Sequence, residues 1–296
     1  MSSPIARRVE RYRLRKASTF AVSDATRDTV HLLPPKQRQR MTNVADRIRS
    51  CAITQYVAIR TPVDDATYIE VSNRRACKIR ICPQCLYRAA CRDRKTLENI
   101  LHHLLQRHPH ARVILITLTT RNRPFFSGLG DMLRDHRKGL ERFWKARRIV
   151  ANSLGAFTAV ELEIRGSAEH PEAGVHSHSI VLVPPEYFAD DVPAIWQAEY
   201  RDLWRKSARL DYDPIVDVRV VRSPDGTDDP DAIFGAIVEC TKYCISLEGL
   251  FDHDETGVIR CNGLIATTIL NAFHRQRLHR FDRCFADAKK RARTHV

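Results

Sequence analysis

The stretch GVHSHSIVLV, residues 174–183, restricts the fold and the chemistry of this chain more than any other segment. Its apolar, β-branched run predicts a buried strand that begins near His176 and His178. Side chains two positions apart on a strand point to the same face, so the two imidazoles would project together. Two neutral imidazoles supply half of the ligands of a divalent-metal site. Packing or surface histidines are the alternative for an isolated His-x-His pattern.

A second strand is expected over residues 156–164, AFTAVELEI, and a loop of about ten residues makes a hairpin with the first strand the economical pairing. A hairpin axis near the middle of that loop places Glu161 opposite His178 and Glu163 opposite His176. A carboxylate beside two histidines suits Mg²⁺ or Mn²⁺ and leaves positions for water and a phosphate oxygen. We favour Glu161 as the ligand, although a shift of two residues would exchange the two glutamates.

The segment IVECTKYCIS lies in a helix expected over residues 230–247. Glu239 and Tyr243 are four positions apart and therefore share one helix face. A phenol with a pKa near 10 is only about 0.1% ionised at pH 7, so as a nucleophile it needs roughly 4 kcal/mol of help. A nearby metal could supply part of this, and the positive charge of Lys242 another part. A packed aromatic on an amphipathic helix is the alternative for Tyr243.

The order of the remaining elements indicates an α+β fold with a mainly antiparallel central sheet and flanking helices. Further strands are expected at residues 111–119 and 214–222, and helices at 83–108, 129–152 and 191–208. A basic helix is also expected within residues 262–296.

The net charge of +14 is unevenly distributed along the 296 residues. Residues 1–50, 51–150, 151–271 and 272–296 carry +8, +12, −12 and +6. Basic outer segments indicate a bound polyanion, and the acidic block between them indicates that cations are held there. A solvated basic surface is the alternative.

Four cysteines are candidate ligands of a structural zinc ion: Cys51, Cys77, Cys82 and Cys85. Four thiolates can close a tetrahedral Zn²⁺ site, with Cys91 as the reserve ligand. Buried thiols are the alternative. The chain shows no apolar leader and no run of about 18 uncharged apolar residues, so a cytoplasmic protein without membrane insertion is expected, in which disulfides would be rare.

These motifs together resemble the HUH endonucleases, specifically the single-tyrosine Rep initiators of rolling-circle plasmid replication. The resemblance covers about residues 50–250. In chain order its parts are Cys51 with CKIRICPQC, the strand motif ILITLTTRN, the segment AFTAVELE, the pair HSH, and ECTKY, which contains Glu239 and Tyr243. Each motif is weak alone, and their order makes the resemblance specific.

The resemblance implies a nicking and joining reaction on plasmid origin DNA that is single-stranded or forms a hairpin at the nick site. Tyr243 would attack a phosphodiester, stay linked to the 5′ phosphate and leave a 3′ hydroxyl that primes synthesis. His176, His178 and Glu161 would hold the divalent metal. Glu239 would activate water at termination, so that no second tyrosine is needed. The chain departs from the family at Ser177, where a bulky apolar residue is usual, and at Ser246, where relatives often carry a lysine.

The resemblance and the charge pattern divide the chain into four parts. A basic N-terminal helical extension (1–50) and a Cys-rich segment (51–95) precede the HUH nuclease domain (96–250), whose sheet would form a palm like that of RNA-recognition motifs. A basic C-terminal helical tail (251–296) follows.

Two other functions agree with the same residues. One is an HUH nuclease of the transposase or relaxase type, and the other is a zinc-containing DNA-binding regulator without catalysis. The sequence contains no G-x4-G-K-[ST] phosphate-binding loop, so unwinding would fall to a host helicase. The origin sequence and a homo-oligomeric state are left open.

Overall fold

The computed structural model describes residues 4–53, 56–60, 68–72, 76–167, 169–189, 192–221, 230–242, 250–253, 258–274 and 276–294. The chain forms two compact units. One unit comprises Met1–Ala89 with Leu247–His274, and the other comprises Ala90–Ser246 with Arg275–Val296. The second unit contains the central sheet, and the first contains the cysteine cluster.

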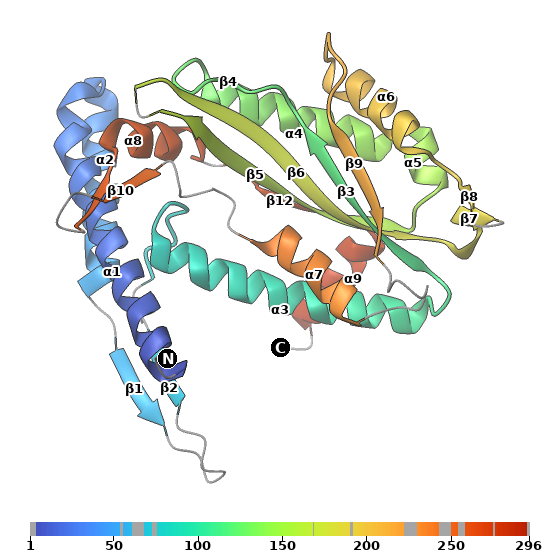
Figure 1. Ribbon diagram of the computed structural model, residues 1–296, viewed down its shortest axis with the longest axis horizontal. Coiled ribbons are helices and arrows are strands. Elements are labelled where there is room, and N and C mark those ends of the chain that lie inside the picture. Colours follow the sequence, from blue (N-terminus) through green and yellow to red (C-terminus); the bar gives the residue numbers. More distant parts are fainter. Residues whose placement is uncertain are drawn as a thin grey trace. The chain divides into compact units, whose positions relative to one another are not determined.

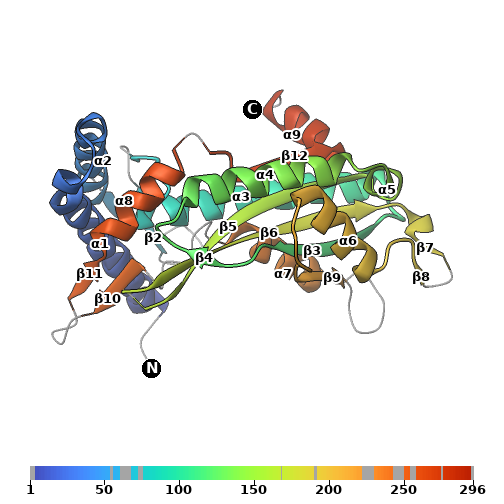
Figure 2. The same cartoon turned by 90° about the horizontal axis from the view of Figure 1, so that it is seen from above.

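The central sheet is antiparallel, with the strand order β12-β5-β6-β3-β9 and the short strand β4 also paired with β6. Its strands are β3 (Arg112–Thr119), β4 (Arg123–Pro124), β5 (Gly155–Gly166), β6 (Pro171–Val183), β9 (Val216–Val220) and β12 (His279–Arg283). Both views show β5 and β6 side by side (Figures 1 and 2). A separate small ribbon pairs β7 (Phe188–Ala189) with β8 (Val192–Pro193), next to the 3-10 turn Pro185–Tyr187.

Helices cover both faces of the sheet, which confirms the expected α+β class (Figure 1). One face is covered by α4 (Leu129–Lys145), α5 (Arg147–Ala151) and α6 (Gln197–Ala208). The other is covered by α3 (Pro83–Arg107), α7 (Pro230–Thr241) and α9 (Cys284–Thr294).

The face of the sheet under α3, α7 and α9 is apolar. Apolar residues at helical spacing on these helices pack on apolar residues at alternate positions of the strands. On α3 the buried stripe is Leu97, Ile100, Leu101 and Leu104. It shares one core with Val113, Phe157, Ile180 and Leu182 of the strands, Ile237 of α7 and Phe285 of α9. This core holds α7 against the sheet and so fixes where the end of that helix lies.

The opposite face is built around Trp204 of α6, whose side chain is fully buried. Its ring lies edge-on to Phe143 of α4 at 6.0 Å between ring centroids. Gly139 lets the helices approach, because a Cβ at that position would lie 3.0 Å from the Trp204 ring and 3.1 Å from the Ala208 backbone. The Trp204 indole N–H also donates a hydrogen bond of 2.8 Å to the carbonyl of Thr119, the last residue of β3.

The first unit is built on a helical hairpin of α1 (Pro4–Thr29) and α2 (Pro35–Ile53), joined through the 3-10 turn Val30–Leu32. Met41, Ala45 and Ile48 of α2 and Val22 of α1 are fully buried. Helix α8 (Gly263–Ala272) packs on α1 in the same unit. Two antiparallel ribbons complete it: β1 (Tyr56–Arg60) with β2 (Tyr68–Ser72), and β10 (Phe251–His253) with β11 (Ile259–Cys261).

Several element boundaries differ from expectation. The expected helix within residues 262–296 is instead α8, strand β12 and α9, because Phe281 of β12 packs on Phe157 of β5 at 4.8 Å and completes the sheet edge. The expected helix 129–152 is interrupted at Ala146, whose backbone is extended. The expected helix 191–208 begins only at Gln197, and α7 ends at Thr241.

Replacing Trp204 by alanine should lower the free energy of unfolding by about 3–5 kcal/mol, because the variant leaves a cavity and an unpaired Thr119 carbonyl. Trp196, at the start of the same helix, is 60% exposed and supplies the control, for which a change within about 0.5 kcal/mol is expected. Urea unfolding of both variants and the unmodified chain tests this. Equal destabilisation by the two substitutions would contradict it.

Candidate active site

The two histidines lie on the face of the sheet that carries α7. His178 is opposite Thr117 of β3 and Ala159 of β5, and His176 is opposite Thr119 and Glu161. Directly opposed residues of antiparallel strands share a face, so both imidazoles project to the same side. Ser177 between them is fully buried on the other side, where its hydroxyl lies 3.5 Å from the Leu118 carbonyl oxygen.

The expected register of the hairpin is wrong by two residues, because Glu161 is opposite His176 and Glu163 is opposite Gly174. Pairing extends beyond the expected strands to Gly166 and Pro171, and Gly166 turns the chain with a φ of 84°. The hairpin axis is therefore displaced. The side chains nevertheless meet diagonally, as long side chains on adjacent strands can. Glu161 Oε2 lies 3.1 Å from His178 Nε2, and Glu163 Oε2 lies 2.9 Å from His176 Nε2.

The end of α7 adds a carboxylate and an ammonium group to this site. Glu239 Oε1 lies 3.6 Å from His178 Nδ1. Lys242 Nζ, just after the helix, lies 2.8 Å from Glu239 Oε1 and 3.1 Å from Glu161 Oε2. Groups from β5, β6 and the end of α7 therefore form one charged network around His178.

The surroundings of the site shift the pKa values of Glu161, His176 and Lys242. Burial raises the pKa of Glu161, but the hydrogen bond with His178 and the charge of Lys242 outweigh burial and hold that pKa below its ordinary value. Burial lowers the pKa of His176 by more than the neighbouring carboxylates raise it. Burial also lowers the pKa of Lys242, but its two carboxylate partners outweigh this effect and raise it. An ionised carboxylate and a neutral imidazole are the forms that bind a metal.

The site residues fit a divalent cation in donor type. His176 Nε2 is buried and has no hydrogen-bond partner of acceptable geometry among the described residues, although Glu163 lies nearby. The three expected ligands, His176, His178 and Glu161, are neighbours on one face. Their ligand atoms are more widely spaced than those of the cysteine cluster. Within the described part of the chain, only the four cysteine sulfurs all lie within 4.8 Å of one another. Tyr243 and Ser246 lie outside the described residues.

One site residue was missed by the sequence argument. Thr117 Oγ1 lies 3.1 Å from His178 Nδ1, on the nitrogen opposite the one that faces Glu161. Strand alternation within ILITLTTRN contained the signal, because a residue directly opposite a histidine shares its face. A polar contact at one ring nitrogen fixes the orientation in which the other nitrogen is presented.

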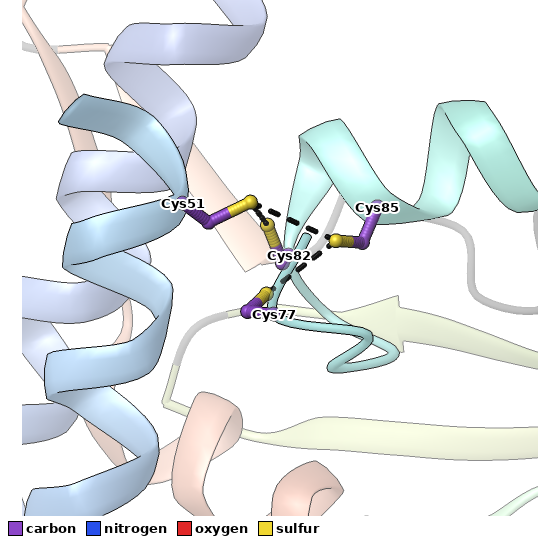
Figure 3. A group of neighbouring side chains, drawn as sticks. All are labelled: Cys51, Cys77, Cys82 and Cys85. Carbon is purple, nitrogen blue, oxygen red and sulfur yellow. Dashed lines mark hydrogen bonds between the residues drawn. The ribbon is translucent and has the colours of Figure 1, made fainter. Parts of the chain in front are cut away.

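The four cysteines predicted as ligands converge in the first unit (Figure 3). Cys51 lies in the last turn of α2, Cys77 and Cys82 lie in the segment before α3, and Cys85 lies in its first turn. All four are buried. The sulfur atoms of Cys51 and Cys85 are 3.7 Å apart, those of Cys77 and Cys85 3.5 Å, and those of Cys51 and Cys82 3.8 Å.

These distances fit a tetrahedral metal site. A Zn–S bond of about 2.3 Å at tetrahedral angles places two sulfurs about 3.8 Å apart. The backbone N–H of Lys78 donates to Cys85 Sγ at 3.3 Å, an outer contact of the kind that supports thiolate ligands. Cys91 is exposed and lies outside the cluster, so the reserve ligand is not required. Cys240 is buried in the core of the second unit, as expected for a packing residue, and burial raises the pKa of its thiol.

Comparison with known proteins gives the family. The sequence profile described as "Replication protein" matches residues 68–295. The chain is 26% identical over 212 residues to "Protein rep" of Lentilactobacillus hilgardii, which covers 71% of this chain and 64% of the relative. It is 26% identical over 186 residues to "Protein rep" of Lactiplantibacillus plantarum, or 62% and 57% of the two chains. It is 28% identical over 182 residues to "Replication protein" of Staphylococcus aureus, or 61% and 74%.

The chain belongs to the replication protein family, since the profile spans most of its length. The resemblance drawn from the motifs is confirmed at this level. The matches cover 64%, 57% and 55% of the first three relatives' own lengths. No solved structure was found to match. None of the helices in the described ranges has the length and apolar character that a membrane span requires.

Proposed function

We propose that this protein initiates rolling-circle plasmid replication by nicking one strand of origin DNA and later rejoining it. The observation that carries the proposal is the network in which Glu161, His178 and Glu239 meet around Lys242, the residue directly before Tyr243. These residues are far apart in the sequence. Their contacts join side chains of strands β5 and β6 to side chains at the end of α7. The family supports a role in replication, and the chemistry is our inference from the residues.

In this mechanism His176, His178 and Glu161 would hold Mg²⁺ or Mn²⁺, which would supply polarisation of the scissile phosphodiester. The Tyr243 oxygen attacks phosphorus, the bond from phosphorus to the 3′ oxygen breaks, and the 5′ phosphate stays on the tyrosine. The phenol proton leaves to a base, and the 3′ oxygen takes up a proton to become the hydroxyl that primes synthesis. Lys242 supplies positive charge beside the reacting groups.

Termination needs a second nucleophile, and we assign to Glu239 the activation of a water molecule for this step. Four positions before Tyr243, its carboxylate can accept a proton from a water molecule that attacks the phosphotyrosine. That attack breaks the tyrosine–phosphate bond, leaves a free 5′ phosphate and returns the phenol after its oxygen takes up a proton. Attack on the same phosphorus by a DNA 3′ hydroxyl, with the tyrosine again as the leaving group, rejoins the strand. Pairing with Lys242 and the approach to His178 keep this carboxylate at the site.

The DNA partner would be bound by positive charge at the rim of the site. Arg121 and Arg123 are exposed at the end of β3 and on β4, and Arg165 is exposed on β5 beside Glu163. Contacts of this kind with phosphates give affinity that falls with salt. A host helicase would separate the strands, and the reaction would take place in the cytoplasm, where plasmids replicate. Oligomerisation stays open.

Replacing Tyr243 by phenylalanine should abolish the covalent protein–DNA adduct, with nicking below about one thousandth of the unmodified rate. The measurement is an SDS-stable adduct on supercoiled origin DNA with Mg²⁺ or Mn²⁺. Tyr87→Phe, which changes a partly exposed tyrosine of the first unit, is the control and should leave the adduct unchanged. An adduct that persists in Tyr243→Phe would exclude this nucleophile.

The same assay separates the alternatives. Cleavage of transposon ends or transfer origins in place of a replication origin would indicate a transposase or relaxase. Origin binding that is insensitive to chelation of divalent metals, without any nicking, would indicate a regulator.

Replacing Glu239 by alanine should leave cleavage in place and slow the release of the phosphotyrosine by about 10²–10⁴-fold, the usual contribution of a general base. Sequencing-gel analysis of a pre-formed adduct measures that release directly. Glu199→Ala, which removes only a surface pair with Arg148, is the matched control. Equal release rates for the Glu239 variant and the unmodified protein would remove Glu239 from termination.

We also propose that the cysteine cluster binds structural Zn²⁺. Protein purified from zinc-replete cells should contain about one zinc per chain, and Cys82→Ser should lose it together with the thermal stability of the first unit. Cys91→Ser removes an exposed thiol outside the cluster and should change neither property. Atomic absorption and thermal unfolding measure both. A zinc content unaffected by Cys82→Ser would refute the assignment.

A further inference from the structure

A β-bulge lies directly beside His176. Thr119 of β3 pairs with His176, and Arg123 of β4 pairs with Ala173 of the same partner strand. The residues between them, 120–122 on one strand and 174–175 on the other, are unequal in number, so the first strand carries one extra residue. The Thr120 N–H and hydroxyl both donate to the Val175 carbonyl, at 3.2 and 3.1 Å. Bulges of this kind change the direction of the side chains that follow.

The extra residue changes which side chain, that of Arg121 or that of Asn122, lies on the face of the histidines. In an unbroken ladder position 121 would be opposite Gly174 and would aim an arginine at the histidine face. With the bulge, the pairing of Arg123 with Ala173 brings the Asn122 side chain beside Gly174. Arg121 turns to the exposed edge, where its guanidinium lies 4.1 Å from the Tyr212 ring centroid and its backbone N–H donates to Tyr212 Oη at 2.6 Å. A short neutral amide thus replaces a cation next to the proposed metal ligands.

Gly174 makes room for that amide. A Cβ on Gly174 would lie 2.6 Å from Asn122 Oδ1 and 3.1 Å from His176 Nε2. The backbone of Gly174 is not in the left-handed region, so its conformation does not require glycine. Glycine is required because of space. The Asn122 amide oxygen and the His176 imidazole nitrogen both approach the position that the Cβ of any other residue would occupy.

The His176 Nε2 atom that approaches this place is buried and makes no hydrogen bond of acceptable geometry among the described residues. Its neighbour is Glu163, whose Oε2 lies 2.9 Å away. Amide oxygens are common ligands of hard divalent cations. We propose that Asn122 Oδ1 is a further ligand of the cation held by His176, placed there by the bulge and by Gly174. This rests on the proposed divalent-metal site and adds a residue to it.

Binding of Mn²⁺ to the full-length protein, without DNA, tests the assignment by electron paramagnetic resonance of free Mn²⁺. Asn122→Ala should weaken binding by about 10–100-fold. Asn122→Asp should restore it, because a carboxylate oxygen replaces the amide oxygen. Gly174→Ala should weaken it as well, since the added methyl group occupies the same space. Asn152→Ala, which removes a partly exposed asparagine whose amide donates to the Arg148 carbonyl at 2.8 Å, is the matched control and should bind Mn²⁺ as the unmodified chain does.

His176→Ala separates the two levels of the inference. If His176→Ala binds Mn²⁺ normally, the metal site of the proposed function fails. If His176→Ala loses binding while Asn122→Ala keeps it, that site stands and the role of Asn122 is overturned. Urea unfolding of each variant identifies loss of fold. Should Asn122→Ala or Gly174→Ala unfold, the Asn122→Asp and Asn122→Ser pair decides, because only the first keeps an oxygen ligand at full reach.

Discussion

The pairing of β5 with β6 is the constraint on which the candidate site depends. Its register runs from Gly155–Leu182 to Gly166–Pro171, and both ends of the hairpin are fixed by it. At the inner end, Phe157 and Ile180 belong to the core that carries α7. At the outer end, the same register brings Glu161 beside His176 and within reach of His178. A register slip would move apolar groups out of the core and the carboxylate away from the histidines together, so folding and site assembly share one pairing.

Local patterns predicted the elements of the sheet well, because strand alternation and helical spacing are properties of neighbouring residues. The pairing of β5 and β6, the shared face of His176 and His178, and the position of α3 are all confirmed. The register was wrong because it depended on a turn whose length the sequence does not specify. The Glu161–His178 contact survived the error, since a glutamate side chain spans the diagonal between strands.

Non-local associations were harder to predict from sequence. The basic composition of residues 272–296 indicated a helix, but β12 is fixed by pairing with β5, more than a hundred residues earlier in the chain. The division into parts at residues 50, 95 and 250 followed charge and motifs. The compact units follow contacts instead, and α8 joins the unit of α1 because it packs there. The convergence of Cys51 with the other three cysteines also joins distant parts of the chain, and it was predicted from residue type, because four thiolates can close a tetrahedral metal site.

The bulge after Thr119 shows why the neighbourhood of a site is less predictable than its centre. Regular alternation predicts that Thr117 and Thr119 share the histidine face, and then predicts Arg121 in the next place. One inserted residue shifts that alternation, so the side chain of Asn122, and not that of Arg121, lies beside Gly174. Neither residue type carries a strong local signal for a bulge. The clearest mark in the sequence is Gly174 itself: a glycine in an extended strand, with no turn to form, marks close approach by another group. A glycine two positions before a His-x-His pair therefore indicates that a residue of the neighbouring strand occupies the space where the glycine has no side chain.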